Sequence, residues 1–245
     1  MRASEGNMLL FYIRHGDPDY SVDGLTPRGA RQAEAVGKRL AVHGLDQIYT
    51  SPAGRAQLTA KPTCEMLGMK AEIVEFAHED NAHRATAVTT EDGRRIWGFQ
   101  HGPTRELFAT EEIRRLGREF YKHPHFAGTN FEERIPKIQA DIDAWLLTLG
   151  YRHDLERNGY IAERPNDDRV ALFAHQGFGM LFLSLVLDIP YPEVCVRMDM
   201  QHSGMSVIRF GKSDGLIIPT LLQMSNDSHI YREGLPLKYN NQFQL

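Results

Sequence analysis

The chain has 245 residues, of which 42% are hydrophobic, 24% charged and 9% aromatic. These are the values of a soluble globular protein, and they exclude collagen-like chains, disordered chains and disulfide-rich scaffolds. Aspartate and glutamate total 32 against 28 lysines and arginines, so the formal charge is −4 and no general surface for nucleic acid or an anionic membrane is indicated.

The cysteines and the start of the chain bear on its compartment. Cys64 and Cys195 form no CxxC motif, so we expect reduced thiols that fill core space. The first apolar run, residues 8–13, is shorter than the apolar part of a signal peptide and far shorter than a membrane-spanning helix. We therefore expect a cytoplasmic protein that begins with a short disordered segment, residues 1–7.

Strands and helices alternate in the first third of the chain. Residues 9–13 (LLFYI) are typical of a buried strand. Thr26, as N-cap, and Pro27, as first helical residue, then open a helix that runs to about His43. The next elements are a strand over 46–50, a helix over about 53–67 and a strand over 71–76. This order predicts an α/β fold: a three-layer sandwich whose mostly parallel central sheet has helices on both faces.

The middle of the chain breaks this rhythm. Residues from about 78 to 130 are polar and irregular, and we predict an inserted lid that sets specificity within a single domain spanning residues 1–245. After it, the pattern predicts a helix over 132–149, a polar loop, a strand over 170–174 (VALFA) and a nearly all-apolar helix over 178–187. Late strands are expected over 206–210 and 216–222, and Pro219 makes the second an edge candidate.

Two predicted strands run directly into a histidine with a glycine close behind it. LLFYI is followed by Arg14-His15-Gly16, and VALFA is followed by His175-Gln176-Gly177. Ligands bind outside the carboxyl ends of strands in an open parallel sheet, so His15 and His175 are expected to converge on one site. A single histidine at a strand end is more often a hydrogen-bonded structural residue. The two glycines, which let backbone approach a ligand, favour a functional pair.

A third element, Ser51-Pro52-Ala53-Gly54-Arg55, follows the second strand. Arg55 falls in the first turn of the next helix, where unpaired N–H groups and the helix dipole favour an anion. An ordinary surface arginine is the alternative interpretation. Arg14 and Arg55 together supply two guanidinium groups that can each bind phosphoryl oxygens with two hydrogen bonds. Two arginines and two histidines thus predict a phosphate pocket.

These segments resemble the histidine phosphatase superfamily, which also contains the cofactor-dependent phosphoglycerate mutases. The resemblance covers the sheet from residue 8 to 76 and again from about residue 169 onward. Four elements occur in the family's order after the expected strands, and residues 226–230 resemble its closing segment. The matching residues are Arg14-His15-Gly16, Leu25-Thr26-Pro27-Arg28-Gly29 with Gln32-Ala33, Ser51-Pro52 through Arg55 with Thr59-Ala60, and Ala174-His175.

The resemblance implies a mechanism that agrees with the chemistry of these residues. His15 attacks phosphorus in line and holds the phosphoryl group as a phosphohistidine, which splits one displacement into two easier steps. Arg14, Arg55 and His175 neutralise charge on the equatorial oxygens. We expect nearby positive charge to lower the pKa of His15 and to keep a lone pair available near pH 7.

The leaving oxygen needs a proton, and in the family a carboxylate just after the third strand supplies it. Glu79 holds the matching position here, and Asp80 is the near alternative because the surrounding stretch is divergent. A solvated acidic pair at the start of a loop is the structural alternative.

The sequence departs from the family after Gly16. Many members have Thr or Ser and then Asn, whereas this chain has Asp17-Pro18-Asp19-Tyr20. Asp17 is expected to orient His15 or to pair with an arginine. Because the mutases' substrate-gripping pattern is absent, a metal-independent phosphatase is favoured, with a mutase-type phosphotransferase or a non-catalytic phosphate-binding module as alternatives. We expect no cofactor, no metal, no nucleic acid and no membrane partner; the partners are a small phosphorylated substrate and inorganic phosphate as product.

Other motifs carry weaker signals. His78 and His83 are five residues apart, about 140° on a helix, whereas a zinc-protease pair needs i and i+4. The pair in 123–125 (HPH) lacks nearby metal-ligating partners, and His202 is a candidate for the pocket rim. Basic and aromatic residues of the insertion either recognise the rest of a substrate or form an ordinary packed lid: Arg84, Arg94, Arg95, Arg105, Trp97, Phe99 and Phe108.

Overall fold

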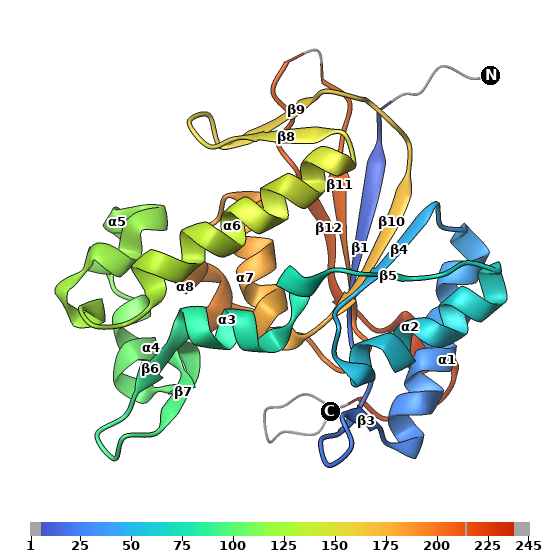
Figure 1. Ribbon diagram of the computed structural model, residues 1–245, viewed down its shortest axis with the longest axis horizontal. Coiled ribbons are helices and arrows are strands. Elements are labelled where there is room, and N and C mark those ends of the chain that lie inside the picture. The colour runs from blue at the N-terminus through green and yellow to red at the C-terminus, as the bar shows by residue number, and fades with distance from the viewer. Residues whose placement is uncertain (1–5, 214, 238–245) are drawn as a thin grey trace.

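The computed structural model describes residues 6–213 and 215–237, and most of the predicted disordered start lies outside them. A six-stranded sheet crosses the molecule in the order β12-β11-β1-β10-β4-β5 (Figure 1). β11 runs opposite to the other five, so the predicted mostly parallel sheet is confirmed. The strands are β1 (Met8–Arg14), β4 (Gln47–Thr50), β5 (Glu72–Ile73), β10 (Arg169–Ala174), β11 (Met205–Phe210) and β12 (Thr220–Asn226).

Helices cover both faces of this sheet. Alternate residues of β1 enter two separate cores: Phe11 and Ile13 pack on the side of α1 and α2, and Leu10 and Tyr12 pack on the side of α6 and α7. This is the expected period of two along a buried strand. Figure 1 shows the two helix layers on opposite sides of the strands. The helices are α1 (Pro27–His43), α2 (Gly54–Leu67), α6 (Phe131–Thr148) and α7 (Gln176–Leu187).

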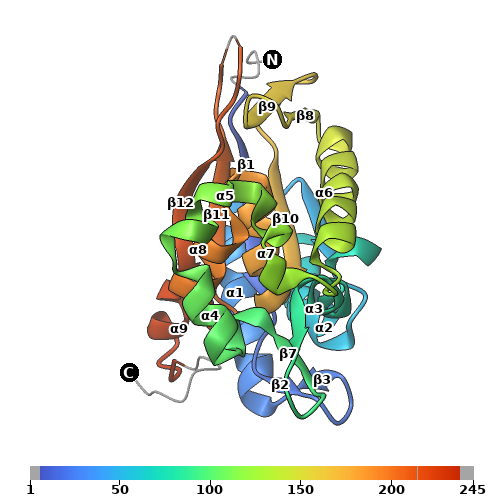
Figure 2. The ribbon, with the colours of Figure 1, turned by 90° about the vertical axis from the view of Figure 1, so that its left-hand side faces the viewer.

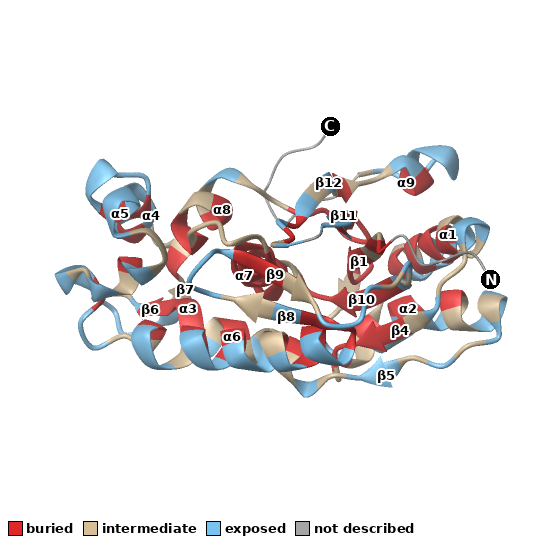
Figure 3. Ribbon diagram, turned by 90° about the horizontal axis from the view of Figure 1, so that it is seen from above, coloured by how far each residue is buried: buried red, intermediate tan, exposed pale blue. Residues whose placement is uncertain are grey.

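Local signals placed the ends of these helices. The Thr26 hydroxyl accepts from the backbone N–H of Gly29 at 3.1 Å, and Pro27 begins α1, as predicted. Gly68 ends α2 in the left-handed region at φ 65°. Figure 3 shows buried residues concentrated in the central strands and in α7, which lies between the sheet and other helices.

The segment 78–130 forms its own small elements and contributes no strand to the six-stranded sheet. A cluster of aromatic rings, Phe108, Phe120, Phe126, Phe131 and Tyr191, packs it together. Figure 2 shows its helices α4 and α5 beside α8 (Tyr191–Arg197). Its role as a lid stays a prediction. The elements are α3 (Glu79–Thr86), β6 (Ala87–Thr89), β7 (Arg95–Trp97), α4 (Gly102–Phe108), α5 (Glu111–Leu116) and the 3-10 helices η2 (Gly98–Gln100), η3 (Gly117–Lys122) and η4 (Pro124–Phe126).

Two strand predictions need correction. The strand expected over 71–76 is only β5, two exposed residues at the sheet edge, because a 3-10 turn, η1 (Glu75–Ala77), follows at once. The last strand begins after Pro219 rather than around it, although β12 is an edge strand as predicted. A short helix, α9 (Ser228–Arg232), then packs against α1.

The predicted polar loop after α6 is instead a hairpin, β8 (Tyr151–Asp154) and β9 (Gly159–Ala162). The side chain of His153 in β8 is buried, with Nδ1 2.8 Å from Asp143 and Nε2 3.0 Å from Asp188, and its ring stacks on Tyr160. Stacking within the hairpin and the contacts of His153 with Asp143 of α6 and Asp188, the residue after α7, fix these strands, which their polar sequence does not reveal. Within the described ranges, the structure has no helix of the length and apolarity that crossing a membrane requires.

Candidate active site

The ends of β1 and β10 bring the two predicted histidines together. The strands pair in parallel with Arg14 opposite Ala174, so His15 and His175 come next at the same sheet edge. The backbone N–H of His15 donates to the carbonyl of Ala174 at 2.9 Å. The two imidazole rings lie 5.2 Å apart between centroids, with planes at 64°.

His15 is buried and held in one tautomer. Its Nδ1 lies 2.7 Å from the carbonyl oxygen of Gly16, and because a carbonyl only accepts, Nδ1 carries the proton and Nε2 of the neutral ring keeps its lone pair. The pKa of His15 lies well below its ordinary value because the ring is buried and because Arg14, Arg55 and His202 add positive charge nearby. Burial is therefore a larger cause than the charges to which the sequence pointed.

His175 is fully buried and contacted from several elements. Its Nε2 lies 2.8 Å from the Ser51 hydroxyl, and its Nδ1 lies 3.4 Å from Oε2 of Glu79. The Tyr12 hydroxyl donates to the His175 carbonyl at 2.6 Å, which fixes the backbone of this turn. Burial, followed by the charges of His15 and Arg55, lowers the pKa of His175 well below its ordinary value.

Arg14, the residue before His15 at the end of β1, is 1% exposed. Its guanidinium donates to the carbonyl of Met200 and, at 2.8 Å, to Nε2 of His202. Burial lowers the pKa of Arg14 to about 10, so the group is still cationic at pH 7. Arg14 thus places a permanent charge next to His15.

Arg55 lies at the start of α2, in contact with Asp23. The Asp23 carboxylate is 2.5 Å from Nη1 of Arg55 and also accepts from the backbone N–H of Gly54 at 2.6 Å. An aspartate therefore occupies the helix N-terminus at which the sequence suggested an anion. Nε of Arg55 is buried and has no hydrogen-bond partner within the described residues, so one donor stays available.

The two candidate carboxylates at the start of α3 face different ways. Oε1 of Glu79 accepts from the backbone N–H of Gly177 at 3.0 Å, while Oε2 faces His175. The side chain of Asp80 is 63% exposed and lies 4.0 Å from Arg84. A Cβ on Gly177 would lie 2.5 Å from Oε1 of Glu79, so this glycine permits the close approach. Glu79, and not Asp80, is the carboxylate beside the histidines.

Asp17 pairs with an arginine, one of its two expected roles, although the partner is neither Arg14 nor Arg55. Its Oδ2 accepts from the Thr26 hydroxyl at 2.8 Å and lies 3.2 Å from Arg28. These contacts tie the segment after Gly16 to the start of α1.

Sequence reasoning gave too little weight to several residues of this site. His202, considered only for the rim, is 2% exposed and its ring lies 5.7 Å from that of His15. It precedes β11, and only the pairing of β11 with β1 places it here. Tyr12 and Asp23 carried no catalytic signal, and Ser51 was noted only as part of a motif.

The histidines considered for metal binding have other partners. His123 lies 3.1 Å from Glu112, and His125 lies 3.1 Å from the Thr104 hydroxyl. His78 accepts from the backbone N–H of Asp80, which caps α3. No group of three or more His, Cys, Asp or Glu within 6–213 and 215–237 is arranged to hold a metal ion.

Known proteins resemble this chain in sequence and in fold. The sequence profile of the histidine phosphatase superfamily (branch 1) matches residues 10–122. A 2,3-bisphosphoglycerate-dependent phosphoglycerate mutase of Brucella anthropi is 30% identical over 213 residues, which cover 81% of this chain and 90% of that protein.

Two solved structures share the fold at lower identity. A mycobacterial glucosyl-3-phosphoglycerate phosphatase has a TM-score of 0.57 and 18% identity, with 89% of this chain and 99% of that chain covered. A phosphoserine phosphatase of Entamoeba histolytica, solved in complex with 3-phosphoglyceric acid, has a TM-score of 0.55 and 17% identity, with 91% and 99% covered.

Proposed function

The chain belongs to the histidine phosphatase superfamily, and from that premise we propose that it is a metal-independent phosphatase that hydrolyses a phosphomonoester through a phosphohistidine at His15. The observation that carries the proposal is the state of His15. Its Nδ1 proton is held by the Gly16 carbonyl, its pKa is lowered by burial and nearby charge, and Nε2 is left as a nucleophile.

The first step transfers the phosphoryl group. A bond forms between Nε2 of His15 and phosphorus while the ester P–O bond breaks, and Glu79 gives its proton to the leaving oxygen. Arg14, Arg55 and His175 stabilise the charge that spreads over the equatorial oxygens. The buried Nε of Arg55 is one donor that such an oxygen would satisfy.

The second step hydrolyses the phosphohistidine and regenerates the free enzyme. Water attacks phosphorus, the Glu79 carboxylate accepts its proton, the P–N bond breaks and inorganic phosphate leaves. His15 is then neutral again with its Nδ1 proton in place.

Trapping the intermediate tests this proposal. Purified wild type and His15→Ala are mixed with p-nitrophenyl phosphate in EDTA, with His123→Ala as a control histidine in the insertion. Wild type and the control should release phosphate and form an acid-labile, base-stable phosphohistidine, and His15→Ala should do neither. Release of phosphate by His15→Ala would overturn the assignment. Binding of vanadate without a phosphohistidine in wild type would indicate the non-catalytic module instead.

A mutase-type phosphotransferase is the second candidate, favoured by the 30% identical bisphosphoglycerate-dependent relative. Against it stands the segment 17–20, whose Asp17 is tied to Thr26 and Arg28. Isomerisation of a phosphoglycerate that exceeds phosphate release and depends on 2,3-bisphosphoglycerate would select the mutase.

The proposal also covers the substrate, the product and the location of the protein. We propose a small phosphorylated substrate, inorganic phosphate as product, a cytoplasmic location and no nucleic-acid partner. A substrate panel covering sugar phosphates, phosphoglycerates, nucleotides and phosphopeptides tests the substrate class.

A further inference from the structure

A polar hollow lies in the segment 78–130, lined by none of the proposed catalytic residues. It has a volume of about 390 Å³ and is formed by the β6–β7 hairpin, the start of α4 and the loop after η4. No aspartate or glutamate is among its lining residues, although the whole chain has more acidic than basic residues. Its polar side chains are those of Thr89, Arg95, His101, Thr104, His125, Thr129 and Asn130.

Arg95 supplies the permanent charge of this hollow. Within the described residues it has no ion-pair partner, and its guanidinium donates only at 3.5 Å to the backbone carbonyl of Arg84. Arg94, on the same hairpin, is paired with Asp92 at 2.7 Å and does not line the hollow. The charge of Arg95 is therefore available to a ligand, whereas that of Arg94 is already neutralised.

Two histidines meet at one hydroxyl in the wall of the hollow. Oγ1 of Thr104 lies 2.8 Å from Nδ1 of His101 and 3.1 Å from Nε2 of His125. A hydroxyl has one proton, so it donates to at most one of these nitrogens and accepts from the other. Burial and the neighbouring His123 and His101 lower the pKa of His125, so near pH 7 this ring is neutral and has a single N–H to donate.

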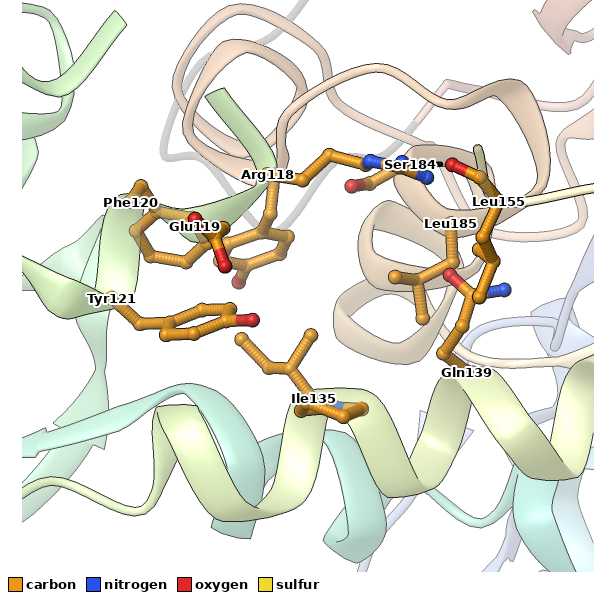
Figure 4. Close-up of a pocket in the computed structure, with 11 residues that line it drawn as sticks. Arg118, Glu119, Phe120, Tyr121, Ile135, Gln139, Leu155, Ser184 and Leu185 are labelled. Atoms are coloured by element: carbon orange, nitrogen blue, oxygen red, sulfur yellow. Dashed lines mark hydrogen bonds between the residues drawn. The ribbon is translucent and has the colours of Figure 1, made fainter. Parts of the chain in front are cut away.

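A second cavity, between η3, α6 and the end of α7, differs from the hollow in its lining and in the state of its arginine. It has a volume of about 230 Å³, and Figure 4 shows the side chains of Tyr121, Ile135 and Leu185 around it. Its Arg118 is paired with Asp188 at 2.6 Å. That cavity is more apolar and its arginine is neutralised, so it lacks the uncompensated charge found at Arg95.

The hollow is also joined to the helix that carries Glu79. Arg95 and Asn130 both donate to the carbonyl of Arg84, in the last turn of α3, where backbone carbonyls lack partners within the helix. The helix begins at Glu79 and has eight residues, so its two ends are about 12 Å apart. Two residues that line the hollow, Arg95 and Asn130, thus donate hydrogen bonds to the C-terminal turn of α3, whose first residue is Glu79.

We propose that this hollow binds a small oxyanion, the carboxylate or phosphate group of a metabolite, with Arg95 as its charged contact. His101, His125 and Asn130 supply further donors, and the absence of lining carboxylates removes repulsion. This site goes beyond the proposed function, because binding there does not require His15 to react.

Amide NMR of the full chain locates the bound anion. Separate titrations with sodium citrate and with inorganic phosphate, at constant ionic strength, are recorded for wild type, Arg95→Gln and the matched control Arg94→Gln. Amides of Val88 and Asn130 report on the hollow, and the amide of Gly16 reports on the proposed active site.

In wild type and Arg94→Gln, the amides of Val88 and Asn130 should shift and saturate with at least one anion, and that anion names the ligand class. Arg95→Gln should weaken this binding about tenfold or more, since a charge-assisted hydrogen bond is lost, and should leave the response of Gly16 to phosphate unchanged. Hollow amides that do not shift, or that respond equally in Arg95→Gln, overturn the proposal. If the amides of Val88 and Asn130 shift as expected but wild type forms no phosphohistidine, the proposed function is refuted and the proposed anion site is not.

Discussion

Replacing Glu79 with glutamine tests the proposed general acid with little change of shape. Oε1 of Glu79 accepts from the backbone N–H of Gly177 at 3.0 Å, and a glutamine carbonyl can accept the same bond. The other oxygen, 3.4 Å from Nδ1 of His175, becomes an amide group with no acidic proton to give. Glu79→Gln therefore removes proton transfer and keeps the contact that caps α7.

The expected loss depends on the leaving group. An alkoxide needs a proton as it departs, so kcat/KM for an alkyl phosphate, which reports phosphoryl transfer to His15 and not the later hydrolysis, should fall by about 10²- to 10⁴-fold, the usual contribution of a positioned general acid. This corresponds to about 3 to 5 kcal/mol of transition-state stabilisation. Nitrophenolate is a stable anion that leaves unprotonated, so kcat/KM for p-nitrophenyl phosphate should fall less than about tenfold, even where kcat falls because Glu79 is missing from the second step.

Initial rates of phosphate release at substrate concentrations well below KM give kcat/KM for both substrates and measure this difference. Asp80→Asn is the matched control, because Asp80 is the adjacent acid and its side chain is 63% exposed, away from the histidines. It should keep both rates. Equal losses of kcat/KM on the two substrates in Glu79→Gln would refute proton donation to the leaving group. A selective loss in Asp80→Asn would move the role to that residue.

Three further predictions concern stability and the pocket. Burial by itself would lower the pKa of His153, but the two carboxylates that contact it, Asp143 and Asp188, outweigh burial and raise the pKa from 6.5 to about 9. The protonated ring therefore stabilises the fold fully below pH 6.5, and this stabilisation, at most about 3 kcal/mol, is lost as pH rises through 9. In urea denaturation, the free energy of unfolding of wild type should fall over this pH range, and His153→Gln should lack this decrease. In Gly177→Ala, the new Cβ would lie 2.3 Å from the Trp97 ring, so we expect about 1 to 3 kcal/mol of destabilisation by urea denaturation and a lower kcat; unchanged values would contradict this packing. His202→Ala removes a hydrogen bond from Arg14 and should raise KM about tenfold with a smaller change in kcat; steady-state rates in which only kcat falls would argue against this positioning.

Elements with strong local signals were predictable to within a residue or two. Thr26 and Pro27 define the start of α1 because a hydroxyl cap and a fixed φ act within one turn. The shortness of β5, which was expected over 71–76, and the hairpin β8–β9 were not predictable. Their extended backbone depends on partners elsewhere in the chain, as with His153 between α6 and α7.

The site divides in the same way. His15 and His175 were predictable because parallel strands end at one sheet edge, which is a property of the fold class. The choice between Glu79 and Asp80 was not, because adjacent residues in the first turn of a helix point about 100° apart and only packing against Gly177 selects one.

By itself, the sequence determined the fold class, the ends of the main helices and the candidate residues of the proposed phosphate site: His15, His175, Arg14 and Arg55. Only the tertiary structure decided their partners, because those contacts join residues distant along the chain. His202 reaches Arg14 across 188 positions, through the antiparallel pairing of β11 with β1. Hydrophobic periodicity says which face of an element is buried, and the packing of those faces decides which polar groups meet.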